Sequence, residues 1–154
     1  SAMATPVYFE DYTSLPFVQV WSTQSYSWTH NVPADLAVPP DTVISATLTV
    51  YAYWMSGSGQ VTVEGVSEGY LVNGIWTWTP LDIGSIFTDG WTAADAPLDV
   101  TVTVSGYSSL TLWGSKFEIC YENGEATAVP EPSTMLLLGF GLAGVAYARK
   151  RFKK

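Results

Sequence analysis

The sequence predicts an all-β protein, an antiparallel β-sandwich or jelly roll, followed by a short C-terminal transmembrane helix. Three observations carry this prediction. Apolar and polar residues alternate with a period of two along several segments, turn-forming residues separate these segments, and no stretch before residue 130 has helical periodicity of any length. Eight or nine short strands in a chain of this size are typical of the two antiparallel folds.

Two segments show the alternation most clearly. At 44–54 the even positions are apolar, while the odd positions are Ser, Thr or Tyr. At 98–104 leucine and valine alternate with aspartate and threonine. Each segment is therefore expected to bury one face and expose the other. Shorter strands are expected at 17–21, 24–30, 60–64, 70–72, 75–78, 109–113 and 116–122.

Gly, Pro, Asn and Asp residues mark the turns between these strands. The pair Asn73-Gly74 lies between two apolar runs, which predicts a two-residue β-hairpin turn. One short helical turn is expected within 82–96. Further turns are expected at 39–41, 56–59, 89–90, 105–106 and 123–124.

The C-terminal tail has three parts in a fixed order. A proline-rich motif comes first, an apolar segment follows at 135–148, and the chain ends on basic residues. The prolines hold the motif extended. The 14 residues of the apolar segment give a helix of about 21 Å, whereas a full span needs roughly 20 apolar residues. The flanking residues must therefore help, and the long basic side chains must snorkel to the interface. The basic end places the C-terminus in the cytoplasm. These membrane-anchor charges are Arg149, Lys150, Arg151, Lys153 and Lys154.

Motif, apolar segment and basic end together resemble the PEP-CTERM signal of bacterial proteins processed by exosortase, a membrane-embedded enzyme. The resemblance covers residues 130–154 and implies sorting from the inner membrane to the cell surface or extracellular matrix of a Gram-negative-type bacterium, with a link to exopolysaccharide or biofilm. An anchor that is never cut is the alternative. The order of strands is also similar to β-sandwich ectodomains that often precede such tails. The sorting-motif residues that the resemblance assigns are Val129, Pro130, Glu131, Pro132 and Ser133.

The predicted domain organisation follows from these segments. Residues 4–122 form a β-sandwich ectodomain, 123–129 a linker and 130–154 the sorting tail. Residues 1–3 are either the remnant of a removed tag or part of a signal-peptidase site, since Ala2-Met3-Ala4 has the small-x-small pattern. An exported protein needs an export signal, and we expect one to have been removed.

Charge excludes several classes of partner. Lys116 is the only Lys or Arg before the tail, against 14 acidic residues when Glu131 is included, so the net charge of this part is near −13. Such a surface repels the phosphates of nucleic acid and anionic membranes. It tolerates cations and neutral glycans.

The residues needed for catalysis are sparse, so we expect no enzyme. His30 is the single histidine, no G-x-S-x-G elbow is present, and His30 is expected to be a partly exposed histidine at a strand end. A glycine pattern of the dinucleotide-binding type, at 139–144, lies inside the apolar tail and is rejected. Cys120 is expected to be a small buried residue, with an intermolecular disulfide as the alternative.

Two sets of side chains are candidates for binding. The loop aspartates Asp89, Asp95 and Asp99 could hold Ca²⁺, the one cofactor considered, although loop aspartates also serve as turn formers. Aromatic side chains are abundant, and an exposed aromatic row could stack on sugar rings, although each aromatic residue could instead fill the core. The candidate glycan-binding residues are Tyr51, Tyr53, Trp76, Trp78 and Trp91.

These observations predict an exported cell-surface or extracellular-matrix protein, sorted by exosortase, with a structural or adhesive role in an exopolysaccharide or biofilm matrix. Two alternatives stay open. One is a carbohydrate-binding module that uses an exposed aromatic face. The other is a structural subunit that self-associates through exposed strand edges.

Overall fold

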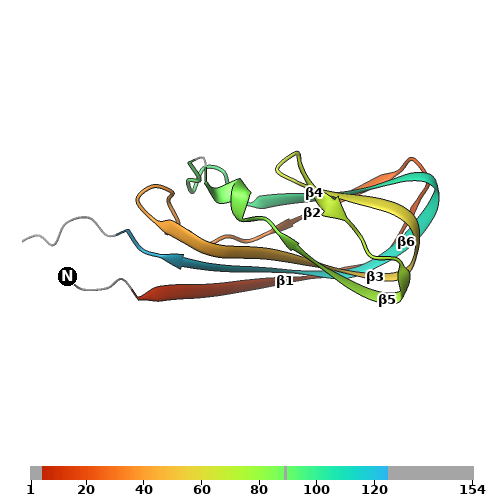
Figure 1. Ribbon diagram of the computed structural model, residues 1–154, viewed down its shortest axis with the longest axis horizontal. Helices are drawn as coiled ribbons and strands as arrows, with labels where there is room; N and C mark the ends of the chain where they lie inside the picture. Colours follow the sequence, from red (N-terminus) through yellow and green to blue (C-terminus); the bar gives the residue numbers. More distant parts are fainter. Residues whose placement is uncertain (1–4, 89, 125–154) are drawn as a thin grey trace, which may run out of the picture. The chain divides into compact units, whose positions relative to one another are not determined.

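The computed structural model describes residues 5–88 and 90–124. The chain divides into two units, Ser1–Gly124 and Glu125–Lys154, and the described residues all lie in the first. In these residues the protein is mostly antiparallel β-sheet and contains no α-helix, which confirms the predicted all-β class (Figure 1).

The predicted membrane helix at 135–148 lies outside the described residues. Within them, no helix has the length and apolar character that a membrane crossing requires.

Six strands and one 3₁₀ turn make up the described fold. The short helical turn expected within 82–96 is confirmed as η1, Gly84–Phe87. The strands are fewer and longer than predicted, because several predicted segments join into continuous strands. They are β1 (Pro6–Trp21), β2 (Ser25–His30), β3 (Thr42–Val63), β4 (Val66–Tyr70), β5 (Gly74–Asp82) and β6 (Leu98–Glu122).

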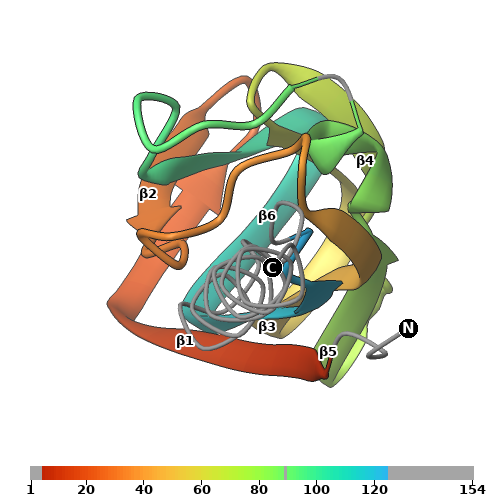
Figure 2. The same ribbon diagram turned by 90° about the vertical axis from the view of Figure 1, so that its left-hand side faces the viewer.

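The two longest strands, β3 and β6, pair along both of their halves and divide the sheet into two layers. The C-terminal half of β6 pairs with β1 and with the first half of β3, whose other edge pairs with β5. The N-terminal half of β6 pairs with β2 and with the end of β3, next to β4. The layer orders are therefore β1-β6-β3-β5 and β2-β6-β3-β4. Figure 2 shows β2 and β4 on the opposite side of the core from β1 and β5.

Both long strands pass from one layer to the other through a bend at the same end of the domain (Figure 1). The turns predicted at 56–59 and 105–106 are wrong, because β3 and β6 run on through both sites. Gly57 and Gly106 supply the bends, with φ of 93° and 70°. A Cβ on Gly57 would overlap the side chain of Ser108, whose hydroxyl accepts a hydrogen bond from the amide of Ser58 at 2.9 Å.

The predicted hairpin turn at Asn73-Gly74 is also wrong. Both β4 and β5 pair with β3, at its opposite halves, so the segment between them carries the chain from one layer to the other. The tight two-residue turn lies instead at Glu64-Gly65, between β3 and β4, where Val63 pairs with Val66. Glu64 and Gly65 both have positive φ, 50° and 77°, as a type I′ hairpin turn requires.

The alternation predicted the core well, except at the ends of the segment 44–54. All four apolar residues predicted to be buried at 98–104 are fully buried, and so are those at 46–52. Ile44 and Trp54 were expected in the core, but both are exposed. The register of β3 against β6 shifts between Val43 and Ser45 and again between Tyr53 and Ser56. Each irregularity turns the neighbouring side chain to the other face.

Candidate functional site

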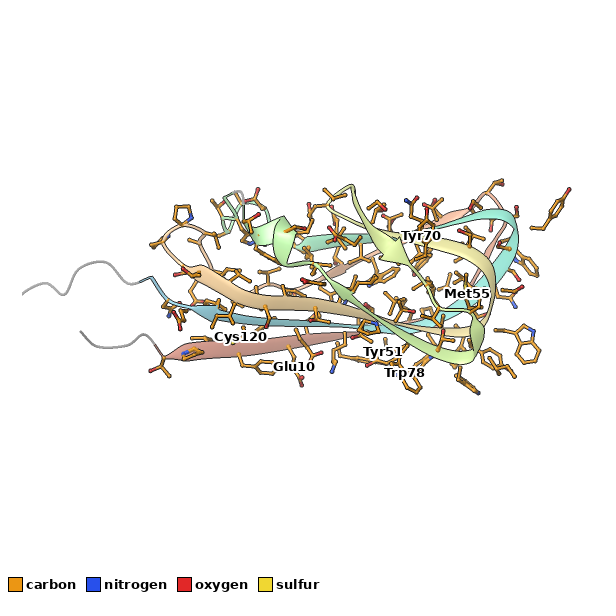
Figure 3. The ribbon with its side chains drawn as sticks, viewed as in Figure 1. Glu10, Tyr51, Met55, Tyr70, Trp78 and Cys120 are labelled. Carbon is orange, nitrogen blue, oxygen red and sulfur yellow. The ribbon has the colours of Figure 1, made fainter. Side chains whose placement is uncertain are left out.

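Four of the five candidate glycan-binding residues meet on the outer face of the layer β1-β6-β3-β5. Tyr51 and Tyr53 alternate with buried residues of β3 and are half-buried on the outer side, as predicted. Tyr51 pairs with Trp78 and Tyr53 pairs with Trp76 of the neighbouring β5. Trp76 and Trp78 are 57% and 68% exposed. Figure 3 shows Tyr51 and Trp78 on the same side of the sheet, where Glu10 also projects.

The aromatic side chains on this face form a continuous row, here called the aromatic row. Successive ring centroids lie between 4.3 and 6.2 Å apart, close to the separation of about 4.5–7 Å that aromatic pairs favour. The row draws side chains from all four strands of the layer. Its members, in order, are Tyr12, Tyr51, Trp113, Trp76, Tyr53 and Trp54.

A bulge in β6 brings the middle of the row to the surface. Ala52 of β3 pairs with Leu112, whereas Tyr51 pairs with Gly114, so Trp113 is an extra residue on β6. Gly114 leaves room above the sheet for the ring of Tyr12, and a Cβ at Gly114 would overlap the phenol group. Neither Tyr12 nor Trp113 was a sequence candidate. The alternation Tyr8, Glu10, Tyr12 was the available signal for a strand at the start of the chain.

Trp91, the fifth candidate, does not belong to this face. Its side chain is 4% exposed, and its ring packs against Phe87 with a centroid distance of 4.9 Å. It follows η1 in the loop before β6. Trp91 is therefore part of the core, which was the alternative to glycan binding for each aromatic residue.

The polar groups beside the aromatic row neutralise one another. The Tyr8 hydroxyl donates to Glu118 at 2.5 Å, and Lys116 forms an ion pair with the same carboxylate at 3.0 Å. The hydrogen bond to Glu118 raises the pKa of Tyr8 to about 12. Hydrogen bonds from Tyr8 and Lys116 lower the pKa of Glu118. Because the one lysine before the tail is already paired, this face has little attraction for an anionic ligand.

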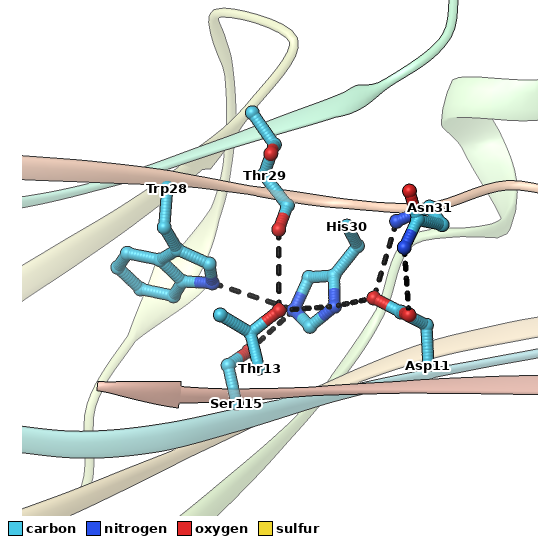
Figure 4. A network of polar contacts seen from close by, with 7 residues as sticks. All are labelled: Asp11, Thr13, Trp28, Thr29, His30, Asn31 and Ser115. Carbon is cyan, nitrogen blue, oxygen red and sulfur yellow. Dashed lines mark hydrogen bonds and ion pairs between the residues drawn. The ribbon is translucent and has the colours of Figure 1, made fainter.

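His30 is buried, which corrects the expectation of a partly exposed strand-end histidine. Its Nδ1 lies 2.9 Å from Asp11 Oδ2, and its Nε2 lies 2.9 Å from Ser115 Oγ (Figure 4). Trp28 donates its Nε1–H to the same Nε2 at 3.3 Å. Because a tryptophan nitrogen only donates, Nε2 accepts, and the proton of the neutral ring sits on Nδ1, facing Asp11.

Ser115, His30 and Asp11 are thus connected in the order of a serine-hydrolase triad. The side chain of Ser115 is fully buried, however, so its hydroxyl is not accessible to a substrate from solvent. Asn31 also donates to Asp11, from its backbone amide and from its side chain, both at 3.1 Å. Sequence reasoning missed this network because its members come from three strands.

The structure does not bring the candidate calcium-binding aspartates together within the described residues. Asp89 lies outside the described residues, and no three acidic, histidine or cysteine side chains within 5–88 and 90–124 gather as metal ligands would. Asp95 accepts hydrogen bonds from the amide and hydroxyl of Thr92 at 2.7 and 2.8 Å. Asp99 is exposed on β6.

Cys120 is half-buried on the outer face, in register with Tyr8.

Comparison with protein families identifies a PEP-CTERM protein-sorting motif at residues 128–151. This match confirms the resemblance of the tail. The signal implies export that depends on exosortase, with processing at a membrane. Neither the curated proteins nor the solved structures contain a significant match to the chain.

Proposed function

We propose that this protein is a non-enzymatic cell-surface or extracellular-matrix protein with a structural or adhesive role in an exopolysaccharide or biofilm matrix. The PEP-CTERM motif at 128–151 carries the proposal. Before processing, the chain is anchored in the inner membrane with its basic end in the cytoplasm, because five of its six Lys and Arg residues follow Ala148. The inaccessible hydroxyl of Ser115 supports a non-enzymatic role.

Carbohydrate binding by the outer face is the second candidate, and it specifies how the protein would adhere. The observation that favours it is the aromatic row, which crosses four strands and lies beside the exposed Trp78. Contiguous exposed apolar surface on a domain is commonly a binding site. The net negative charge and the pairing of Lys116 with Glu118 favour a neutral glycan over an anionic one.

We infer that the two layers form a jelly-roll sandwich. The strand orders β1-β6-β3-β5 and β2-β6-β3-β4 support this, since β3 and β6 each contribute one segment to both layers. In such a scaffold the outer face is held by hydrogen-bonded strands on a packed core, so its aromatic side chains are positioned before a ligand arrives. Preorganisation of this kind reduces the entropy lost on binding.

Changing both Pro130 and Pro132 to alanine is expected to abolish processing in a host that contains exosortase, because alanine does not restrict the preceding residue to extended backbone as proline does. The measurement follows a tagged full-length chain by immunoblot of membrane and secreted fractions. The unprocessed form should accumulate at the membrane. A Glu125→Gln variant, upstream of the motif, serves as the matched control and should be processed normally. Unchanged processing and surface delivery of the proline variant would refute sorting through this motif.

A further inference from the structure

We propose that Trp21 and Trp54 form the walls of a cleft that binds one sugar ring of a neutral glycan, at the end of the aromatic row. The inference rests on the proposed carbohydrate-binding function and adds a site to it. Neither tryptophan was a sequence candidate for binding.

The cleft is built by three adjacent strands. Trp21 comes from β1 and Trp54 from β3, and the small residues of β6 lie between these two strands. The register places Ser109 beside Trp21, and Thr111 between Gln19 and Tyr53. Large side chains on the flanking strands and small ones on the central strand produce a groove. Its volume is about 100 Å³, and its lining is Gln19, Trp21, Trp54, Ser109, Leu110 and Thr111.

The backbone at Trp54 holds its indole in this position. Trp54 has a φ of 57°, in the left-handed region that bulky residues seldom adopt. It lies where the register of β3 shifts, and its side chain is 58% exposed rather than buried. A strained backbone that presents a large apolar side chain to solvent contributes little to stability, and strain of this kind gathers at functional sites.

The cleft continues the aromatic row instead of standing apart from it. The ring of Trp54 lies 5.5 Å from that of Tyr53, which in turn contacts Trp76. A glycan that follows the row therefore reaches the cleft without leaving aromatic surface. At about 100 Å³ the cleft is smaller than the roughly 300–1,000 Å³ of pockets for drug-sized ligands, so it suits a single ring of a longer chain.

The chemistry of the lining fits a neutral sugar. The two indoles, 56% and 58% exposed, offer flat apolar faces for the C–H faces of a pyranose ring. The amide of Gln19 and the hydroxyls of Ser109 and Thr111 can donate to and accept from sugar hydroxyls. Among the residues that the structure describes, no charged side chain lines the cleft, so none of them pairs there with a carboxylate or sulfate group.

The test is a titration of the full-length chain, in detergent, with cellohexaose, chitohexaose, mannohexaose and the anionic hexagalacturonate. Calorimetry gives the affinity, and tryptophan fluorescence reports on the indoles. We expect binding of at least one neutral hexaose and none of hexagalacturonate. Trp21→Ser and Trp54→Gly should each weaken that binding about tenfold, which corresponds to about 1.4 kcal/mol. Glycine at 54 accepts the positive φ, so the second variant should fold.

Tyr107→Ser is the matched control, because Tyr107 is fully exposed and lines no part of the cleft. Its affinity should equal that of the unchanged protein, and thermal unfolding should confirm that all variants are folded. Binding that is lost on changing Trp76 and Trp78, yet unaffected by both cleft variants, would overturn the cleft and leave the aromatic face standing. Failure of the unchanged protein to bind any neutral hexaose would overturn both. Concentration-dependent dimerisation that Trp21→Ser abolishes would overturn the sugar site by identifying a second copy as its occupant.

Discussion

Replacing Phe117 with alanine is expected to lower the free energy of unfolding by about 3–5 kcal/mol. Phe117 is fully buried in the central strand β6. Its ring stacks on Phe87 at 5.9 Å and contacts His30 at 6.1 Å and Phe9 at 6.5 Å. The truncation leaves a cavity among side chains of two strands and η1, and the loss is a large fraction of the roughly 5–15 kcal/mol that stabilises a typical domain.

Urea denaturation of the unchanged protein and of Phe117→Ala measures this loss of unfolding free energy. Phe117→Leu is the matched control, since it keeps most of the apolar volume and should cost clearly less than alanine. The dependence of the unfolding free energy on urea should stay the same in both variants. Equal costs for alanine and leucine would contradict the packing described around Phe117.

Acid is expected to destabilise the fold as the pH falls below 6.5, through protonation of His30. Burial lowers the pKa of His30 below its ordinary value of 6.5, although the hydrogen bond with Asp11 acts in the opposite direction. Trp28 adds a geometric reason, because its N–H points at Nε2 and opposes a second proton there. The unfolded chain therefore binds a proton that the folded chain resists. This stabilisation is complete above pH 6.5 and declines toward the lowered pKa, by at most about 1.4 kcal/mol per pH unit.

A second decline is expected at lower pH, through Asp11. Burial raises the pKa of this carboxyl, but the hydrogen bonds from His30 and Asn31 outweigh burial and bring the pKa below its ordinary value of 3.8. The stabilisation from Asp11 is therefore complete above pH 3.8 and is lost as the pH falls through the lowered pKa.

The measurement is the free energy of unfolding between pH 8 and pH 5, for the protein and for His30→Gln. The variant should be less stable at pH 8 and should lose the slope that begins at pH 6.5, because the chain has no other histidine. Glu68 contributes with the opposite sign, since burial raises its pKa, so only the difference between the two proteins is assigned to His30. A slope that persists in the variant would contradict the role of His30.

Alternation in the sequence predicted the fold class and most of the buried face, because the side chains of a strand point to its two sides in turn. It failed at Ile44 and Trp54, where register shifts invert the pattern. Such shifts depend on which strand pairs with which, and one segment read alone does not contain that information. The turn at Asn73-Gly74 failed for a related reason, since its flanking strands belong to different layers.

At the candidate site, too, the sequence predicted only the residues whose position depends on their own strand. Tyr51, Tyr53, Trp76 and Trp78 were predicted because their own strands set their direction. Tyr12 and Trp113 joined them through pairing between strands and through the bulge in β6. The cleft between Trp21 and Trp54, and the network around His30, bring together residues of three strands, and no spacing along the chain reveals them.

Adhesion to the matrix through the outer aromatic face is tested most directly by co-sedimentation of the full-length chain with the host's purified exopolysaccharide. The comparison is between the unchanged protein and a variant with Trp76→Ser and Trp78→Ser, the two tryptophans of β5, both exposed. Ile75→Ser is the control, because Ile75 is also exposed on β5 and lies outside the aromatic row. We expect the unchanged protein and the control to sediment with the polysaccharide, and the double variant to lose at least about tenfold in affinity while remaining folded. Equal sedimentation of the folded double variant, or none by the unchanged protein, would contradict adhesion through this face.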